Sequence, residues 1–348
     1  MRKTFTILFL AIVVLYSWFG YQSIANQEEL NCQMEGTLSE IAEEVIAIPL
    51  ETNTHCRLEQ IGSIKRDKEH IFLVSNQQLY HFNREGKFLG KITNSQKPIE
   101  VIDYVIDPTH SCLIVIGKNK EVHYYDYAGQ LLAQRTLPQN ASWKTFGHLA
   151  YYNHYLWATI DLINTEDEHA VTVEQWLYKF DLNFREVDKR KLEAADLGRI
   201  NINHRPNPEI SISPNGQVYV QAPSLQPSQI LNDTLYLIST KQLTITEGYS
   251  KILPVKIGAR FLISLYHNPL SAESSYTFCY DQRKTKAYNI QGGLKDNFYM
   301  TGEIQTLQPM DIYNQIYCYY QKGDKLNQSF PKRKVDDNPV LFIVKMKA

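Results

Sequence analysis

The chain has 348 residues, of which 43% are hydrophobic and 21% charged, so it can bury a substantial core and does not belong to the disordered class. Its formal net charge is −1, and without the two basic residues at its N-terminus it falls by two, to −3. The remaining basic residues are scattered along the chain, whereas nucleic-acid binding normally needs a basic stripe. We therefore expect no nucleic-acid partner.

The first 25 residues have the pattern of a signal peptide. Two basic residues precede an apolar run from Phe5 to Phe19, and Ser23 and Ala25 stand at the small-residue positions of a signal-peptidase site. The sequence therefore predicts cleavage between Ala25 and Asn26. It also predicts an exported protein, located in the periplasm, at the cell surface or outside the cell.

An uncleaved membrane anchor is the alternative interpretation of this segment. The stretch from Thr4 to Tyr21 has 18 residues, close to the length that spans a bilayer. The protein would contact the membrane only in that case. A lipoprotein site is not expected, because Cys32 is preceded by Glu29, Leu30 and Asn31 and not by small residues.

A β-hairpin is predicted at residues 79–92, LYHFNREGKFLGKI. The β-forming residues Leu79, Tyr80 and Phe82 lead into a polar turn that ends in Gly86, and glycine tolerates the positive φ of such turns. A continuous apolar run at 70–75 precedes the hairpin. At least three strands therefore follow one another as a meander.

The same pattern returns further along the chain. Tyr125 lies 43 residues after Phe82, and Gly129 follows Tyr125 by four residues, as Gly86 follows Phe82. We therefore interpret Gly86 and Gly129 as equivalent structural turn glycines.

Further copies of the pattern are more degenerate. A third copy has Phe180 at the aromatic position and Phe184 in place of the turn glycine, and weaker copies are marked by Ile238, Tyr280 and Ile343. Repeats of roughly 40 to 55 residues with short strands and no long amphipathic helix are typical of a β-propeller. The six copies predict an all-β fold, a six-bladed β-propeller of four-stranded antiparallel blades.

No linker divides the chain, so we expect one propeller domain at 44–348 after a lead segment at 26–43. A ring of blades has no open sheet edges only if the N- and C-terminal strands share a blade. We therefore expect VLFIVKM (340–346) to pair with EVIAIPL (44–50). The pattern Thr37-x-x-Glu40 also permits a short capped helix in this region, but Val45, Ile46 and Ile48 favour a strand.

The five cysteines form neither a disulfide framework nor a zinc-binding pattern. Cys112, Cys279 and Cys318 lie in apolar, strand-like runs and are interpreted as buried free thiols. Cys32 and Cys56 are the one pair for which a disulfide remains open.

Catalytic motifs are absent from the sequence: it has no GxSxG, HExxH, P-loop or GxGxxG. Its ten histidines do not fall at metal-ligand spacing, and His81 and His123 lie at different distances from their repeat markers. The acidic stretch at 164–169 lacks the alternation and the glycine of a calcium loop. We therefore expect no catalytic residue, no cofactor and no bound metal.

Four motifs together resemble six-bladed β-propeller proteins of the NHL/TolB-like type from bacterial envelopes. The motifs are IPLETN (48–53), LYHFNREGKFLGKI (79–92), NDTLYLI (232–238) and DDNPVLFIVKMK (336–347). The resemblance spans roughly residues 40–348. It implies the fold but no single activity, because propellers include binding modules and enzymes alike.

The sequence favours an exported, non-catalytic binding or scaffold protein. Its ligand would be a peptide, a glycan or another envelope protein, held at the mouth of the propeller channel. The alternative is a lyase or hydrolase that acts on a glycan or peptide with a metal at the channel mouth. That alternative requires three or more His, Asp or Glu residues at equivalent positions of different blades. A cell-surface sensor or assembly subunit is a third interpretation.

Overall fold

The computed structural model describes most of the chain from residue 36 to residue 348 and shows an all-β protein. The residues it does not describe are 1–35, 93–98, 138–145, 168–169, 197–208, 222–249, 252–254, 258–259, 268–275, 282, 284–285, 292–293, 305–306 and 327–328. The predicted cleavage site at Ala25 and Asn26, Cys32, and the repeat marked by Ile238 lie outside the described residues.

Three of the sheets are four-stranded antiparallel meanders, formed by consecutive strands. The first contains β2 (Ile61–Arg66), β3 (His70–Ser75), β4 (Gln78–Asn83) and β5 (Phe88–Lys91). The second contains β6 (Val101–Asp107), β7 (Cys112–Gly117), β8 (Glu121–Asp126) and β9 (Leu131–Thr136). The third contains β10 (Phe146–Tyr152), β11 (Tyr155–Asp167), β12 (Ala170–Asp181) and β13 (Glu186–Asp196).

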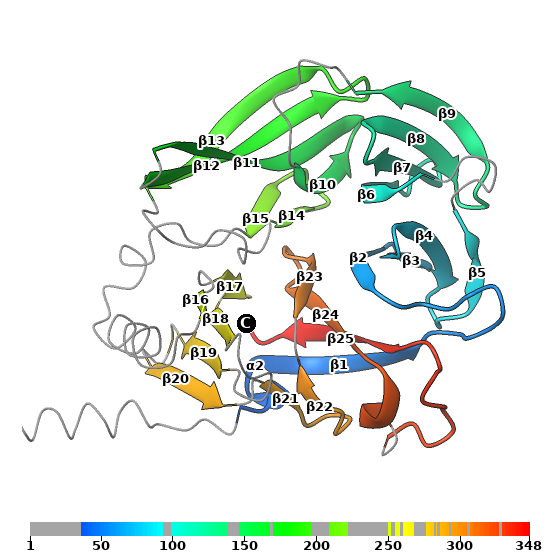
Figure 1. Ribbon diagram of the computed structural model, residues 1–348, viewed down its shortest axis with the longest axis vertical. Coiled ribbons are helices and arrows are strands. Elements are labelled where there is room, and N and C mark those ends of the chain that lie inside the picture. Colours follow the sequence, from blue (N-terminus) through cyan, green and yellow to red (C-terminus); the bar gives the residue numbers. More distant parts are fainter. Residues whose placement is uncertain are drawn as a thin grey trace, which may run out of the picture.

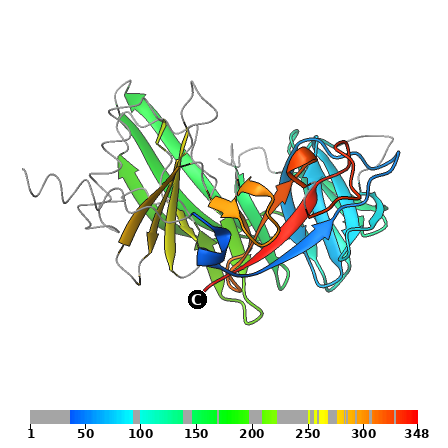
Figure 2. The same cartoon turned by 90° about the horizontal axis from the view of Figure 1, so that it is seen from below.

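A fourth four-stranded sheet contains both ends of the described chain. Its order is β1 (Ala42–Pro49), β25 (Val340–Met346), β24 (Ile316–Gln321) and β23 (Gln308–Asp311). The predicted pairing of the two terminal segments is confirmed, because β1 runs antiparallel to β25 with Ile46 opposite Ile343. The two strands lie side by side in Figures 1 and 2.

The remaining strands form three further groups. They are the pair β14 (Glu209–Ile212) and β15 (Val218–Gln221); the sheet of β16 (Ser250–Lys251), β17 (Val255–Ile257), β18 (Phe261–His267), β19 (Tyr276–Asp281) and β20 (Lys286–Gln291); and the pair β21 (Leu294–Asp296) and β22 (Gly302–Ile304). The helical elements among the described residues are short: α2 (Leu38–Ile41) and the 3₁₀ turn η2 (Gly323–Leu326). Helix α2 leads directly into β1, so the segment that permitted both a helix and a strand contains both.

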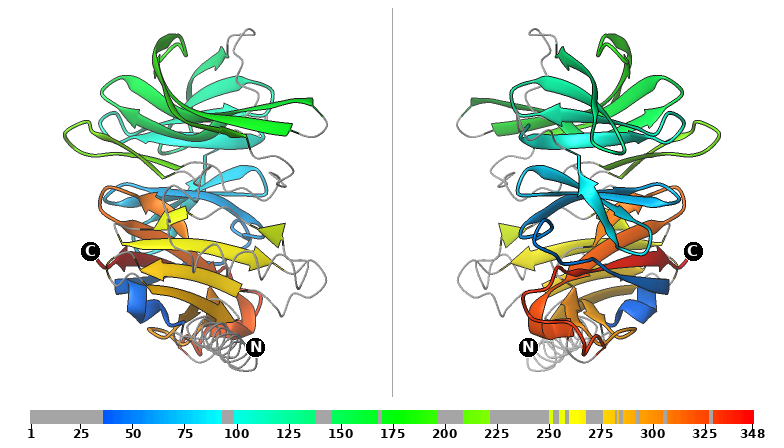
Figure 3. Two further views of the ribbon diagram at one scale, coloured as in Figure 1. Left: turned by 90° about the vertical axis from the view of Figure 1, so that its left-hand side faces the viewer. Right: turned by 90° about the vertical axis from the view of Figure 1, so that its right-hand side faces the viewer.

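The sheets are arranged as a propeller around a common centre (Figure 1). Strands β2, β6, β10, β14 and β23 follow one another around that centre, and β23 in turn contacts β2. The chain therefore enters each of these sheets at the middle and moves outward strand by strand. The views in Figure 3 place the C-terminus beside α2, where the backbone N–H of Lys347 donates to the carbonyl of Ile41 at 2.9 Å.

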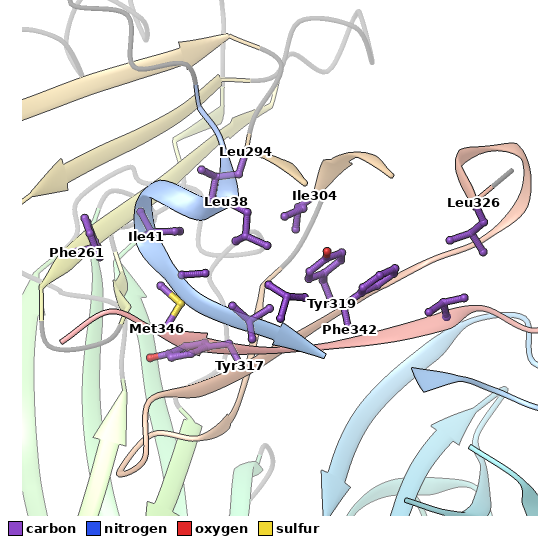
Figure 4. Packing of buried hydrophobic residues seen from close by; sticks show 14 residues of the cluster. Leu38, Ile41, Phe261, Leu294, Ile304, Tyr317, Tyr319, Leu326, Phe342 and Met346 are labelled. Atoms are coloured by element: carbon purple, nitrogen blue, oxygen red, sulfur yellow. The ribbon is translucent and has the colours of Figure 1, made fainter. Parts of the chain in front are cut away.

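The core lies between the faces of neighbouring sheets, because each strand alternates its side chains between two covered faces. Figure 4 shows the cluster around the closing sheet, in which Tyr319 stacks on Phe342 with ring centroids 4.6 Å apart. Leu38 and Ile41 of α2 are fully buried in the same cluster. The short helix thus covers the end of the sheet that joins the two ends of the chain.

One turn recurs between the third and fourth strands of the first three sheets. In each, the side-chain oxygen of the first turn residue, Asn83, Asp126 or Asp181, accepts a hydrogen bond from the backbone N–H four residues later. The fourth turn residue has positive φ, with values of 86° for Gly86 and 87° for Gly129. Each glycine permits this turn at no steric cost.

The third copy of the turn has Phe184 in place of glycine, with φ of 59°. A bulky side chain is uncommon in this conformation. The phenylalanine ring is buried against the hydrophobic core between the second and third sheets. Burial of an aromatic side chain, worth roughly 1.5–3 kcal/mol, offsets the backbone strain at this position.

Candidate functional site

Four ionisable side chains form a chain across four neighbouring sheets at the centre of the ring. They are Lys65 of β2, Asp103 of β6, His148 of β10 and Glu209 of β14. The side chain of Asp103 is 3% exposed, whereas those of Lys65, His148 and Glu209 are 20%, 20% and 24% exposed. This central charged chain is the candidate functional site.

Lys65 and Asp103 form its first ion pair. The Nζ atom of Lys65 lies 2.9 and 3.1 Å from the two carboxylate oxygens of Asp103 and also donates to the carbonyls of Tyr104 (2.5 Å) and Leu149 (3.1 Å). An ammonium group has three hydrogens, so this one is fully used. The carboxylate of Asp103 in turn accepts from the backbone N–H of Leu149 at 2.9 Å. The N–H of Leu149 in β10 thus binds Asp103 of the second sheet, and its carbonyl binds Lys65 of the first sheet.

His148 connects the third sheet to the next pair of strands. Its Nε2 atom lies 2.8 Å from a carboxylate oxygen of Glu209, and its Nδ1 atom lies 3.9 Å from Oδ2 of Asp103. Burial lowers the pKa of His148, but the charge of Glu209, the hydrogen bond to it and the charge of Asp103 outweigh burial and hold the pKa above its ordinary value. When His148 is protonated, two positive and two negative charges balance along the chain.

The backbone of the innermost strands explains how these side chains reach the centre. Register shifts interrupt the pairing of β2 between Ile61 and Ile64, of β6 between Val101 and Asp103, and of β10 between Phe146 and Leu149. A bulge inserts an extra residue and redirects the neighbouring side chains, and bulges are common beside functional sites. Asp103 lies at the edge of one bulge and His148 lies within another. These two side chains therefore leave the ordinary alternation of their strands.

Neutral polar contacts continue the connection to the closing sheet. The hydroxyl oxygen of Ser211 in β14 accepts from the backbone N–H of Ile312 at 2.9 Å. The hydroxyl of Tyr317 in β24 lies 2.7 Å from Oε1 of Gln221 and donates to it. Contacts between side chains and backbone thus link the first sheet, through the centre, to the sheet that contains the C-terminus.

The chemistry available in this chain is limited because its charges already have partners. Nδ1 of His148 is the exception, since it is buried and has no hydrogen-bond partner. Among the residues that the structure describes, no three or more His, Cys, Asp or Glu side chains are placed to hold a metal ion together. The central charged chain can stabilise the contacts between neighbouring sheets and line the centre with polar groups.

The turn glycines singled out in the sequence lie elsewhere, at contacts between neighbouring sheets. A Cβ atom on Gly86 would lie 2.4 Å from the carbonyl oxygen of Pro49 in β1, and one on Gly129 would lie 2.9 Å from that of Lys91 in β5. Each turn therefore approaches the outermost strand of the preceding sheet. His81 and His123 lie two and three residues before the turn residues Asn83 and Asp126, so they do not occupy equivalent positions.

Sequence reasoning did not identify the central charged chain. A usable signal was a charged residue within an otherwise apolar first strand, as in VIDYV around Asp103. That signal does not name the partner, since Lys65 and Asp103 are not adjacent in sequence. Glu209 lies at the start of a four-residue strand and has no apolar run before it to mark it.

The described cysteines offer no reactive group. Cys56, Cys112 and Cys318 are buried thiols. The disulfide that the sequence left open between Cys32 and Cys56 stays a prediction, because Cys32 lies outside the described residues. Burial raises the pKa of Cys56 and of Cys112 to about 11, and it also raises that of Cys318. A raised pKa keeps a thiol protonated and poorly nucleophilic.

The fold and the central chain define the protein as a β-propeller built from four-stranded antiparallel sheets. A family model described as "Domain of unknown function (DUF4934)" matches residues 22–247, more than half of the chain, and the chain belongs to that family. No curated protein matches the sequence.

One solved structure with a TM-score above 0.5 supports the fold at low sequence identity. It is an exported-protein candidate from Bacteroides fragilis NCTC 9343, 15% identical, with 91% of this chain and 98% of that chain covered and a TM-score of 0.56. Two further structures match with lower scores. They are the β-propeller domain of Cps50 (Swd1) from Myceliophteria thermophila (7% identical, 80% of this chain and 95% of that chain covered, TM-score 0.37) and a Bacteroides caccae protein of unknown function (10% identical, 75% and 70% covered, TM-score 0.30). In the described part of this chain, no helix has the length and apolar character to cross a membrane.

Proposed function

We propose that this protein is an exported, non-catalytic binding or scaffold protein that holds a peptide, a glycan or a partner envelope protein at the mouth of its channel. The similarity to a structure described as an exported-protein candidate supports export. So does the signal-peptide pattern that ends at Ala25. Residues 44–348 form the binding domain in this proposal.

The observation that carries the proposal is the state of the ionisable groups at the centre. Lys65 has no free donor, and the carboxylate of Asp103 is held by Lys65 and by the backbone of β10. A general acid or base must exchange protons with a substrate, and a group held in this way is poorly suited to do so. The centre thus supports a rigid scaffold that presents its surface to a ligand.

The finer architecture belongs to the same proposal. A six-bladed ring of the NHL/TolB-like type would consist of the four complete sheets, the sheet of β16–β20, and a blade begun by β14 and β15. The spacing of the repeat markers along the sequence supports six units.

Ile102 offers a direct test of ligand binding at the channel. This side chain is 49% exposed on β6, an innermost strand, so in this proposal it is the apolar group that a ligand at the channel contacts. The protein should be screened against peptide and glycan arrays, and each hit should be repeated with Ile102→Asp. We expect the variant to lose at least tenfold in affinity while its melting temperature is unchanged.

Leu132 provides the matched control. It is 55% exposed on β9, the outermost strand of the same sheet. Leu132→Asp changes exposed apolar area by a similar amount but far from the centre, so it should leave affinity unchanged. Equal effects of the two substitutions, or turnover of the bound peptide or glycan, would contradict the proposal.

A further inference from the structure

A histidine pair lies between the first and second sheets, away from the central charged chain. His70 begins β3 and His81 lies on β4, and their ring centroids are 4.9 Å apart. The ring of His81 stacks on Phe72 at 4.4 Å. The side chain of His70 is 30% exposed, whereas His81 is 4% exposed. One imidazole is thus open to solvent and the other lies directly behind it.

The hydrogen bonds of His81 fix its tautomer. Its Nδ1 atom lies 2.9 Å from the carbonyl oxygen of Tyr127, which can only accept, so Nδ1 carries the proton. The lone pair therefore lies on Nε2. That atom is buried and has no hydrogen-bond partner. Buried acceptors in folded proteins almost always have a partner, so this atom is placed to bind one.

His70 has a matching arrangement. Its Nδ1 atom lies 3.3 Å from Oδ1 of Asp67, and this carboxylate is itself fixed by the hydroxyl of Tyr127, which donates to Oδ2 at 2.8 Å. Donation from Nδ1 to the carboxylate leaves the lone pair of His70 on Nε2 as well. Metal-binding histidines usually donate their second N–H to a carboxylate or a backbone carbonyl, and this pair shows one of each.

The separation of the rings also fits a shared ion. With metal–nitrogen bonds of about 2.1 Å, two imidazoles at a tetrahedral angle have centroids about 5 Å apart. The observed 4.9 Å agrees with this value. We propose that His70 and His81 bind one divalent transition-metal ion through their Nε2 atoms, with water completing the coordination.

The electrostatics of the pair are consistent with the proposal. Burial, followed by the neighbouring His70, lowers the pKa of His81 to about 4, so at neutral pH no proton competes for its lone pair. Two protein ligands are fewer than the four of a closed structural zinc site, so we expect moderate affinity and an ion that exchanges with solvent past His70. Nothing in the spacing of the ten histidines along the sequence predicts this pair.

Calorimetric titration with Zn²⁺ tests the site, using the full chain without a polyhistidine tag. We expect one ion per chain. His70→Ala should weaken binding at least tenfold. His81→Phe should abolish binding because it removes the ligand nitrogen, while phenylalanine retains the stacking on Phe72 and so preserves the packing. Asp67→Asn should weaken binding by about 10-fold, the usual effect of removing a carboxylate that orients a ligand.

A second turn of the same kind supplies the control. His110 Nδ1 lies 2.7 Å from Oδ2 of Asp107, as His70 approaches Asp67, but the position that corresponds to His81 is Tyr124. The ring of His154, an exposed residue, lies 6.0 Å from that of His110. His110→Ala should leave Zn²⁺ binding intact.

Three results would overturn the proposal. They are no stoichiometric binding to the unaltered chain, binding that survives both His70→Ala and His81→Phe, and binding that His110→Ala removes. Circular dichroism of each variant, compared with the unaltered chain, identifies any loss of binding that comes from unfolding. As a second measurement, Cu²⁺ bound to the unaltered chain should give electron paramagnetic resonance with coupling to two nitrogen atoms, reduced to one in His70→Ala.

Discussion

The side-chain oxygen of Asn338 accepts a hydrogen bond of 2.7 Å from the backbone N–H of Leu58, a residue 280 positions earlier in the chain. The amide nitrogen of Asn338 donates to the carbonyls of Glu51 (2.6 Å) and Cys56 (2.9 Å). Glu51 also binds the first hairpin, through its N–H to the carbonyl of Gly86 and through Oε2 to the N–H of Phe88. Three of the motifs that carry the family resemblance therefore meet at one point, where the ring is closed.

Asn338→Ala tests how much this junction contributes. The substitution leaves the N–H of Leu58 and the carbonyl of Glu51 without this partner and removes one of two donors from the carbonyl of Cys56, so we expect a loss of about 3 kcal/mol in the free energy of unfolding. Urea denaturation measures it. Asp336→Ala, two residues earlier and exposed, should change stability by less than about 0.5 kcal/mol. Equal stability of the two variants would show that closure does not depend on the amide.

Alanine substitutions at glycines with positive φ separate backbone strain from close contact. Gly86→Ala and Gly129→Ala add both, because each new methyl group meets the preceding sheet at 2.4 or 2.9 Å. Gly323 has φ of 74° but nothing within 4 Å, so its replacement adds strain alone. We expect losses of about 1 kcal/mol at Gly323, more at Gly129 and most at Gly86, the last at roughly 3 kcal/mol or above. Melting curves that rank the three otherwise would contradict the contact with β1.

Removing one partner of the central ion pair should be costly. Lys65→Met removes the nearest cation from the buried carboxylate of Asp103 and leaves it the N–H of Leu149 and the more distant His148, and breaking a buried pair in this way costs about 3–5 kcal/mol. The double variant Lys65→Met with Asp103→Leu removes both charges and should recover much of that loss. Denaturation of the single and double variants measures the difference. A single variant as stable as the unaltered chain would mean that the pair does not hold β10 in place.

Two histidines should give opposite pH dependences. His81 has a folded pKa of about 4, below the unfolded value of about 6.5. Its neutral form is therefore favoured by folding, and the stability it provides is present above pH 6.5 and is lost as the pH falls toward 4. Melting temperatures measured with a chelator should fall over this range less steeply in His81→Phe than in the unaltered chain.

His148 has a raised pKa, so the sign reverses. Its contribution to stability is present below its unfolded pKa of about 6.5 and is lost as the pH rises through the higher folded pKa. His148→Gln should show a smaller decline on the alkaline side than the unaltered chain. A steeper alkaline decline in this variant would show that the carboxylates of Asp103 and Glu209 do not hold the proton.

Processing at the N-terminus is tested by intact mass and N-terminal sequencing of the exported protein. We expect the mature chain to begin at Asn26, because Ser23 and Ala25 have the side chains that signal peptidase requires. A chain recovered from the membrane fraction that still begins at Met1 would support the uncleaved anchor.

The sequence was informative where one residue type has one physical role. Gly86 and Gly129 could be recognised because a positive φ selects glycine, and the pairing of 340–346 with 44–50 followed from the need to close a ring. Phe184 shows the limit of this reasoning. Its turn has the same positive φ as the other two, but here the strain is offset by burial of the phenylalanine side chain in the core. Such burial depends on residues distant in sequence and leaves no local pattern.

The central charged chain lay beyond prediction for a related reason. Asp103 stands in an apolar strand and is visible as an exception, yet its partners Lys65 and Leu149 are selected by how three sheets pack around the centre. Bulges move these side chains out of the simple alternation that sequence periodicity detects. The unpartnered Nε2 of His81 likewise depends on the position of Tyr127 in the neighbouring sheet.

The antiparallel pairing of β1 with β25 also dictates the order of folding events. Strand β1 is synthesised early, but its hydrogen-bonding partner is among the last residues described, so its edge stays open while the intervening sheets form. Such a late, non-local contact slows folding, and until it forms it leaves an unpaired, aggregation-prone strand edge exposed. If the chain crosses a membrane unfolded, N-terminus first, the ring cannot close until translocation is nearly complete. The yield of closed molecules would then depend on chaperones that cover β1 after export.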